Sequence, residues 1–149
     1  MAADDDRLHV VCPHCQAVNR IPTARLEDRP VCGKCKQRLF TGSPVALDDG
    51  SFDRQISRND IPVVVDFWAP WCGPCTMMAP AYEAAAATLE PQVRLAKLNT
   101  EEAPAIAARF NIQSIPTIAI FQGGHETARQ AGAMSQEQMV VRWVQSKIG

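Results

Sequence analysis

The sequence predicts an α/β fold, with a mixed sheet flanked by helices, preceded by a small and separate N-terminal domain. Across residues 43–149, β-branched runs alternate with segments whose apolar residues have helical spacing. Residues 1–42 are instead polar, are interrupted by prolines and contain four of the six cysteines. The 149 residues, 46% of them hydrophobic, suffice for a folded core and exclude both a large multidomain protein and a disordered chain. We therefore place a domain boundary near residue 43.

Four segments are predicted to be strands of the sheet. Residues 63–69 are rich in Val and aromatic residues and are bounded by prolines, which is the composition of a buried central strand. Residues 93–99 and 117–121 have a similar character, and a short run over 126–131 follows a Gly-Gly turn. Strands that alternate with helices predict a mixed sheet covered by helices.

Helices are predicted between these strands and at the end of the chain. Apolar residues recur with helical spacing in two segments: Tyr82, Ala85, Ala86 and Leu89, and then Ala103, Ile106, Ala107 and Phe110. Thr100 is expected to cap the second of these helices, because its hydroxyl can accept from an unpaired amide. Ser135 and Gln138 match a capping box at the start of a terminal helix.

Charge and hydropathy narrow the class of protein. With 15 basic and 16 acidic residues the net charge is −1, which argues against nucleic-acid binding through phosphates. The first residues are acidic, and no apolar run reaches the roughly 18 residues that span a bilayer. We therefore expect a cytoplasmic protein with neither a signal peptide nor a membrane anchor. The six cysteines form three Cys-x-x-Cys pairs, which in a reducing compartment are usually metal ligands or redox centres.

Two of these pairs predict a zinc site in the N-terminal domain. Cys12, Cys15, Cys32 and Cys35 form a C-x2-C-x16-C-x2-C pattern, the spacing of a four-thiolate zinc site. Four thiolates complete a tetrahedral ion and leave no position for a catalytic water, so the metal is expected to be structural. Gly33 supplies a residue that is free to take a positive φ in the tight turn of the second pair. A domain this small needs such a cross-link.

Two alternatives stay open for this cysteine quartet. His14 lies between two of the cysteines, where it is either a competing ligand or an exposed loop residue. The four cysteines can also be spare thiols or redox disulfides that bind no metal. The spacing favours the four-thiolate zinc site over both.

The third pair is placed to carry redox chemistry. It lies in Trp71-Cys-Gly-Pro-Cys75, directly after the central strand and at the start of a predicted helix. The positive end of the helix dipole lowers the pKa of Cys72 and makes its thiolate the attacking group. Cys75 returns to nearly the same helix face, deeper and within disulfide reach, where it can resolve a mixed disulfide. Pro74 loses no helical hydrogen bond in the first turn.

Two charged residues on neighbouring strands are candidates for assisting this pair. Asp66 lies in an apolar strand, either as a buried acid whose raised pKa lets it accept the Cys75 proton or at a solvent-exposed position. Lys97 either moderates the charge of that carboxylate or faces solvent. Pro116 precedes a later strand, where it is either cis or an ordinary strand-start proline.

Together these residues resemble the thioredoxin family. The resemblance is carried by residues 65–75 (VDFWAPWCGPC), by Ile115-Pro-Thr117 and by the glycines Gly124 and Gly132, and it covers residues 44–149. With the preceding four-cysteine segment, nearly the whole chain resembles the zinc-containing thioredoxins of bacteria. The resemblance implies a thioredoxin fold with an N-terminal zinc-ribbon-like domain.

The resemblance also implies an activity, that of a thiol-disulfide oxidoreductase which reduces protein disulfides. Cys72 would be the nucleophile, Cys75 the resolving cysteine and Asp66 the proton acceptor. Reducing equivalents would come from NADPH through thioredoxin reductase, with no tightly bound organic cofactor and with Zn²⁺ in a structural or redox-regulatory role. The implied tasks are redox homeostasis and defence against oxidative stress, and nothing in the sequence demands more than a monomer.

A substrate surface follows from the same resemblance, which also places the peptide bond before Pro116 in cis. The surface is an apolar patch around an exposed sulfur of the first cysteine, and its residues are Trp71, Gly73, Pro74, Ile115, Pro116, Gly132 and Ala133. The backbone of Ile115 is free to pair with an extended peptide. Thr76 stands where many thioredoxins carry a basic residue, so the redox potential of the dithiol need not match the usual value of the family.

Two further hypotheses concern the N-terminal domain. In the first it is a docking or nucleic-acid adaptor, although Phe40 is the only aromatic residue in residues 1–42, beside Lys34, Lys36 and Arg38. In the second, oxidation of the zinc thiolates releases the metal and switches the reductase, because zinc-bound thiolates remain oxidisable.

Overall fold

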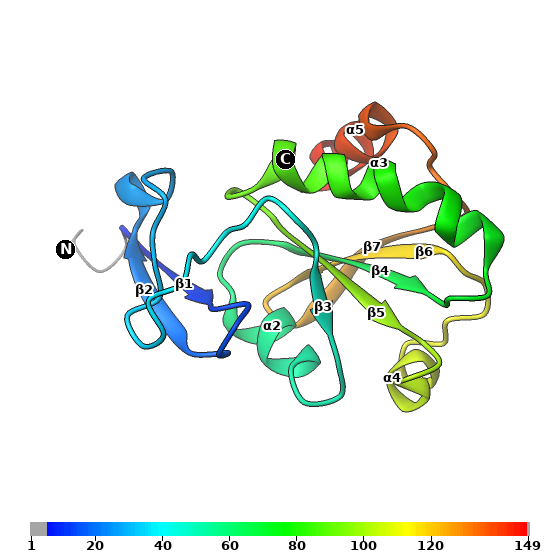
Figure 1. Cartoon of the computed structure of the whole chain (residues 1–149), viewed down its shortest axis with the longest axis horizontal. Helices are drawn as coiled ribbons and strands as arrows, with labels where there is room; N and C mark the ends of the chain where they lie inside the picture. The colour runs from blue at the N-terminus through cyan, green and yellow to red at the C-terminus, as the bar shows by residue number, and fades with distance from the viewer. Residues whose placement is uncertain (1–5, 149) are drawn as a thin grey trace.

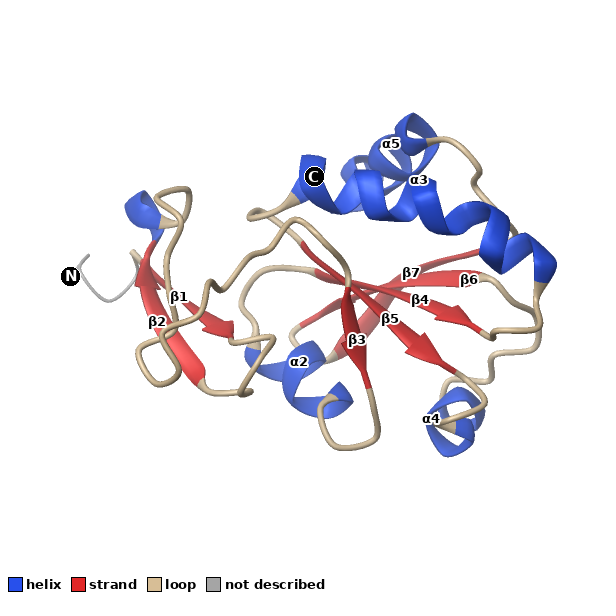
Figure 2. Ribbon diagram, viewed as in Figure 1, coloured by secondary structure: helices blue, strands red, loops and turns tan. Residues whose placement is uncertain are grey.

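The structure is a computed structural model that describes residues 6–148. The acidic start of the chain, residues 1–5, lies outside the described residues, as does Gly149. Figures 1 and 2 show a small N-terminal part beside a larger sheet covered by helices. In the small part, β1 (Arg7–Val11) pairs antiparallel with β2 (Val18–Pro22), and a short 3-10 helix, η1 (Thr23–Arg25), follows.

The larger sheet has five strands in the order β3-β5-β4-β6-β7. Their bounds are β3 (Val45–Leu47), β4 (Val63–Trp68), β5 (Arg94–Asn99), β6 (Thr117–Gln122) and β7 (His125–Ala131). The central strand, β4, runs parallel to β5 and antiparallel to β6, which confirms the predicted mixed sheet. Its first five residues are all buried, as the β-branched composition predicts for a strand covered on both faces.

Two helices cover each face of this sheet (Figures 1 and 2). They are α2 (Phe52–Arg58), α3 (Gly73–Leu89), α4 (Pro104–Arg109) and α5 (Glu137–Ile148). Val64 of β4 shares a buried cluster with α3 and α5, whereas its neighbours Val63 and Val65 share one with α2 and α4. Successive side chains of a strand point to opposite faces, so the central strand supplies both cores.

Both predicted helix caps are wrong. α4 begins at Pro104, and the hydroxyl of Thr100 donates instead to a carbonyl oxygen of β4, at 3.1 Å. Proline suits the first position of a helix because its missing N–H would have been unpaired there. α5 begins at Glu137, and the carbonyl of Gln136 accepts from the amides three and four residues later, so Ser135 is not its cap.

The sequence pattern does not predict β1, β2, β3 or α2. β1 and β2 have five residues each, β3 has three and α2 has seven. β3 and α2 are shorter than the runs in which a strand or a helical period can be recognised. In the part of the chain that the structure describes, no helix combines the length and the apolar character needed to cross a membrane.

Buried polar side chains of the larger part bind the backbone of the N-terminal part. Gln55 Nε2 donates to the carbonyl oxygen of Cys12 at 3.4 Å. Asn59 Oδ1 accepts from the amide of Val11 at 2.8 Å, and Arg94 Nη2 donates to the carbonyl oxygen of Val11 at 2.9 Å. The three side chains belong to residues that are at most 2% exposed. Because buried polar groups are costly without partners, these contacts give the two parts one specific arrangement.

Arg94 is the largest of the fully buried side chains. Its guanidinium lies 4.6 Å from the centroid of the Phe40 ring and 3.8 Å from the carboxylate of Glu90. Burial lowers the pKa of Arg94 to about 10 and raises the pKa of Glu90. Glu90 also accepts from the amide of Gly42 at 3.1 Å. The buried pair therefore connects the end of α3 and the start of β5 to the N-terminal part.

Candidate functional site

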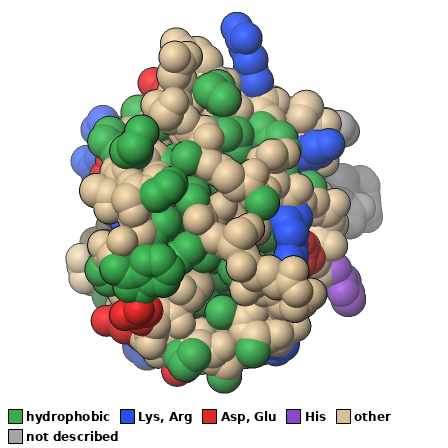
Figure 3. Space-filling model, turned by 90° about the vertical axis from the view of Figure 1, so that its right-hand side faces the viewer, with side chains coloured by type: hydrophobic (Ala, Val, Ile, Leu, Met, Phe, Trp, Pro, Cys, Tyr) green, Lys and Arg blue, Asp and Glu red, His purple; other side chains and the backbone are tan. Residues whose placement is uncertain are grey.

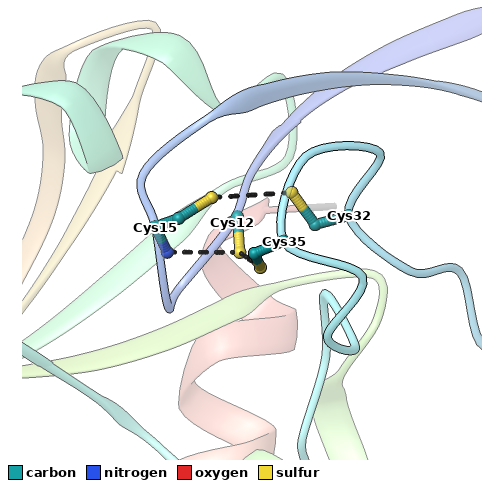
Figure 4. Close-up of side chains that lie close together, drawn as sticks. All are labelled: Cys12, Cys15, Cys32 and Cys35. Carbon is teal, nitrogen blue, oxygen red and sulfur yellow. Dashed lines mark hydrogen bonds between the residues drawn. The ribbon is translucent and has the colours of Figure 1, made fainter.

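Four cysteines of the N-terminal part bring their sulfurs together (Figure 4). The Sγ atoms of Cys12, Cys15, Cys32 and Cys35 all lie within 4.8 Å of one another. The Cys12–Cys35 and Cys15–Cys32 sulfur pairs are each 3.6 Å apart. Four Zn–S bonds of about 2.3 Å in tetrahedral geometry separate the sulfurs by about 3.8 Å. The donor set and its spacing thus fit one zinc ion.

Each first cysteine of the two pairs lies in a tight loop whose amides point at its sulfur. Cys12 Sγ accepts from the amides two and three residues later, at 3.3 and 3.5 Å. Cys32 Sγ accepts from the amide two residues later at 3.3 Å and from the side chain of Asn19 at 3.5 Å. Such donors orient metal-bound thiolates and offset their negative charge.

The metal-free thiols of this cluster differ in pKa. Burial raises the pKa of Cys12 to about 12, whereas a hydrogen bond from the backbone of Cys35 lowers the pKa of Cys32 to about 6. A zinc ion needs all its cysteine ligands as thiolates, so its binding displaces the protons that the more basic thiols retain.

The two cysteine loops show which residues reverse the chain and where His14 lies. Gln16 and Lys36, which follow the second cysteine of each pair, both have a φ of 66°. Gly33 lies outside the positive-φ region, and its amide donates to a side-chain oxygen of β2 at 2.8 Å. The chain therefore reverses after each pair and not within it. The exposed ring of His14 faces the carbonyl oxygen of Arg38 at 3.2 Å and is not part of the sulfur cluster.

The third cysteine pair lies at the N-terminus of α3. Cys72 immediately precedes the helix and is disulfide-bonded to Cys75 in the first turn, with Pro74 between them. The amide of Cys75 donates to Cys72 Sγ at 3.2 Å, and the same sulfur lies 3.7 Å from the carbonyl oxygen of Ile115. After reduction, this amide and the positive end of the helix favour a thiolate at Cys72 over a thiol.

Asp66 is a buried acid on β4. The residue is 3% exposed, and burial raises the pKa of its carboxyl group to about 7, against the opposing effect of the Lys97 charge. Among the described residues, its Oδ1 atom has no hydrogen-bond partner. Lys97 faces Asp66 in the β4–β5 register, is half-buried, and places Nζ 4.6 Å from the centroid of the Trp68 ring. The solvent-exposed alternatives for both residues are therefore not observed.

A groove of about 720 Å³ opens beside Cys72, on a face where apolar side chains gather (Figure 3). Its walls are residues 71–74, part of α4 with the turn before it, and residues 112–115. Trp71 is 68% exposed, whereas Cys72 is only 4% exposed. The expectation of an exposed sulfur is wrong for the disulfide form, because Ile115 packs against the two cysteines.

Four of the seven residues expected to contact substrate line this groove, namely Trp71, Gly73, Pro74 and Ile115. The other three do not. Pro116 is buried, and the peptide bond before it is cis, as the resemblance implies. The amide of Gly132, which has a φ of 98°, donates to the carbonyl oxygen of Pro116 at 2.9 Å, and Ala133 follows it as an exposed residue.

The sequence prediction misses the wall that α4 supplies. Pro104, Ala107 and Ala108 line the groove there. Helical spacing marks Ala107 as an inward-facing position, but spacing does not show that the neighbouring face of the helix borders a groove. Glu101, in the turn before α4, is also missed: its carboxylate accepts a hydrogen bond from Trp71 Nε1.

Comparisons with known proteins agree for both parts of the chain. A family model described as Thioredoxin matches residues 43–146, and a zinc-ribbon model described as Thioredoxin 2, N-terminal, matches residues 11–37. Thioredoxin C-3 of Corynebacterium nephridii is 44% identical over 125 residues, which cover 84% of this chain and 86% of the relative. Thioredoxin of Porphyra purpurea is 46% identical over 88 residues (59% and 82%). The chloroplastic M-type thioredoxin of Chlamydomonas reinhardtii is 36% identical over 123 residues (80% and 88%).

Proposed function

Because the chain belongs to the thioredoxin family and is a thiol-disulfide oxidoreductase, we propose that it reduces disulfide bonds of other proteins with Cys72 and Cys75. The observation that carries the proposal is the position of Cys72, which immediately precedes α3, lines the groove and is bonded to Cys75. A groove beside an exchangeable disulfide lets a polypeptide lie in place while its own disulfide is attacked.

The proposed reaction has two exchange steps. In the reduced protein, the Cys72 thiolate attacks one sulfur of the substrate disulfide, forming a mixed disulfide, and the other substrate sulfur leaves as a thiolate that takes up a proton. Cys75 then attacks the Cys72 sulfur, which releases the second substrate thiolate and forms the Cys72–Cys75 disulfide. The two electrons gained by the substrate come from the two cysteines, so the protein ends in the oxidised state that the structure has.

Asp66 is the proposed acceptor for the proton that Cys75 loses in the second step. Cys75 is 3% exposed, so water has little access to its thiol and a proton acceptor within the protein is favoured. A carboxyl pKa of about 7 makes Asp66 an effective base at neutral pH. Lys97 lowers that pKa by its charge and so keeps part of the Asp66 population ionised.

The substrate segment is proposed to lie along the groove. Trp71, Gly73, Pro74 and Ile115 would contact it directly. The exposed Gly132 and Ala133, beside the buried Pro116, would extend this surface beyond the groove. The carbonyl oxygen of Ile115, 3.7 Å from the Cys72 sulfur, would pair with an extended peptide as a neighbouring strand does.

Cys12, Cys15, Cys32 and Cys35 are proposed to hold a structural Zn²⁺ ion. When bound, the ion joins the two cysteine loops and supplies no chemistry to the exchange steps, because four thiolates fill its coordination. We take residues 1–42 as the zinc domain and 43–149 as the thioredoxin domain.

We infer the compartment and the source of reducing equivalents from the chemistry of the two cysteine centres. Zinc thiolates persist in a reducing compartment, so we infer the cytoplasm. Thioredoxin reductase and NADPH would regenerate the dithiol of a monomeric protein, which would serve redox homeostasis and defence against oxidative stress.

A covalent trap tests the proposed reaction. In a Cys75→Ser variant the mixed disulfide on Cys72 is not resolved, so substrates stay attached. Incubated in a cell extract, this variant should yield protein adducts that a reductant releases and mass spectrometry identifies. The Cys72→Ser, Cys75→Ser double variant is the control and should capture none. A folded, zinc-loaded Cys75→Ser protein with no more adducts than this control would contradict the proposal.

A further inference from the structure

The groove beside Cys72 is uncharged, but one carboxylate is held at its edge. All twelve lining residues are neutral. Glu101 is exposed, its carboxylate accepts from Trp71 Nε1, and its amide donates to Asn99 Oδ1 at 2.9 Å. Trp71 lines the groove and directly precedes Cys72. The carboxylate is therefore fixed beside the wall that adjoins the reactive sulfur.

Basic residues of the neighbouring elements are engaged with other groups. The Lys97 ammonium lies over an aromatic ring of β4. Arg109 of α4 pairs with Asp53, and Arg129 of β7 pairs with Glu126. A polypeptide that approaches the groove therefore meets an apolar surface with a negative charge at one edge.

We propose that Glu101 is a specificity-determining residue and that the favoured substrate is a polypeptide segment with Lys or Arg within a few residues of its disulfide cysteine. The inference rests on the proposed function, because it concerns the substrate of the same site. Complementary charge at the edge of an interface raises the rate of encounter and fixes register. The apolar groove would take the side chains on the other side of the substrate cysteine.

A basic residue also affects the substrate disulfide directly, and the test has to separate the two effects. A nearby positive charge lowers the pKa of a thiol and makes it a better leaving group. Comparing peptides alone therefore mixes the chemistry of the peptide with recognition by Glu101. Comparing the same peptides across protein variants isolates the contribution of Glu101.

The experiment uses three short peptides, each closed by one disulfide and differing only in a Lys, Gln or Glu next to the same cysteine. Pre-reduced full-length protein reacts with each peptide in a single turnover, and chromatography after an acid quench measures the reduced peptide. Glu101→Gln keeps an oxygen that can accept from Trp71 and removes the charge. Glu83→Gln is the matched control, because Glu83 is exposed on α3, about 12 Å along the helix from Cys75.

We expect the wild-type protein to reduce the Lys peptide about tenfold faster than the Glu peptide at low ionic strength. In Glu101→Gln that ratio should fall to about threefold or less, whereas Glu83→Gln should keep the wild-type ratio. Added salt should shrink the difference between wild type and Glu101→Gln, because the charges are exposed and screened.

Three outcomes overturn the inference, and the first two leave the proposed function standing. Reduction of all peptides with the same Lys-to-Glu ratio in wild type and Glu101→Gln leaves the reductase proposal standing and refutes the role of Glu101. An equal fall of the ratio in Glu83→Gln shows a general effect of net charge. Failure of the reduced wild-type protein to reduce any of the three peptides overturns both proposals.

Discussion

The sulfur cluster and the dithiol use the same Cys-x-x-Cys spacing and differ in the backbone that follows it. In the cluster, a residue with a φ of 66° turns the chain back after each pair, and sulfurs of the two loops lie 3.6 Å apart. At the dithiol, the chain continues as the 17-residue helix α3, and the two sulfurs bond to each other. Spacing brings two sulfurs to one side of the chain, whereas the following backbone decides whether a second pair can join them.

The two centres also share a feature. In both, the first cysteine of a pair accepts hydrogen bonds from amides just after it in sequence. Such amides stabilise a thiolate whether it binds a metal or attacks a disulfide. What distinguishes the dithiol is access, because Cys72 lines a groove that is open to a polypeptide.

Substituting one cysteine in each centre should give the largest contrast in activity. We expect Cys72→Ser to lower the reduction of a protein disulfide by about a thousandfold or more, since it removes the nucleophile. Cys12→Ser should retain part of the activity, because the dithiol and its groove remain. The measurement is the rate of disulfide reduction with a regenerating reductant, and equal, complete loss in both variants would show that the two centres do not have separate roles.

Metal removal should affect stability more than the chemistry of the dithiol. Four-thiolate zinc binding is worth about 10 kcal/mol or more, and that energy is available only to the folded N-terminal domain. We expect a chelator, under reducing conditions, to lower the unfolding temperature and to speed hydrogen exchange in β1 and β2 more than in β4. Restored Zn²⁺ should reverse both changes. Identical unfolding curves and exchange rates with and without the metal would refute a structural zinc.

The buried Arg94–Glu90 pair, beside the N-terminal part, gives the next largest effect. Arg94→Met should lower the free energy of unfolding by about 3–5 kcal/mol, because it leaves the Glu90 carboxylate buried without its partner. Adding Glu90→Gln should recover part of the loss. Arg109→Met breaks an exposed pair with Asp53 and should cost about 1 kcal/mol or less. Urea denaturation compares the variants, and equal losses for Arg94→Met and Arg109→Met would show that burial of the pair is unimportant.

Asp66 should make the free energy of unfolding of the dithiol domain depend on pH. Its carboxyl pKa is about 7 in the folded protein against an ordinary value of 3.8, so the folded state binds the proton more tightly between these values. The stabilisation that protonated Asp66 contributes is therefore present in full below about pH 4 and is lost as the pH rises through about 7. Asp66→Asn should be more stable than wild type at pH 8, by about 4 kcal/mol at most, and the difference should vanish near pH 4. A difference that does not change between these pH values would refute the raised pKa.

Much of the fold and of both centres could be predicted from local patterns. The buried run of β4, the helix after Cys72 and the four-cysteine spacing each depend on residues close together in sequence, where period and spacing are informative. The predicted caps of α4 and α5 were wrong, because α4 begins at Pro104 and α5 at Glu137. Where a helix begins depends on a few hydrogen bonds at its end, which the spacing of apolar residues does not specify. Short elements such as β3 and α2 have no readable period.

The sequence alone determined which side chains can carry chemistry: six cysteines at two kinds of position, and an aspartate in an apolar strand. Only the tertiary structure decided which distant residues meet them. The backbone of Val11 and Cys12 binds Asn59, Arg94 and Gln55, and α4 completes the groove, through contacts that span tens of residues. Such contacts leave no periodic trace in the sequence, because a buried polar side chain is stabilised by whichever partner the packed fold brings within hydrogen-bond distance.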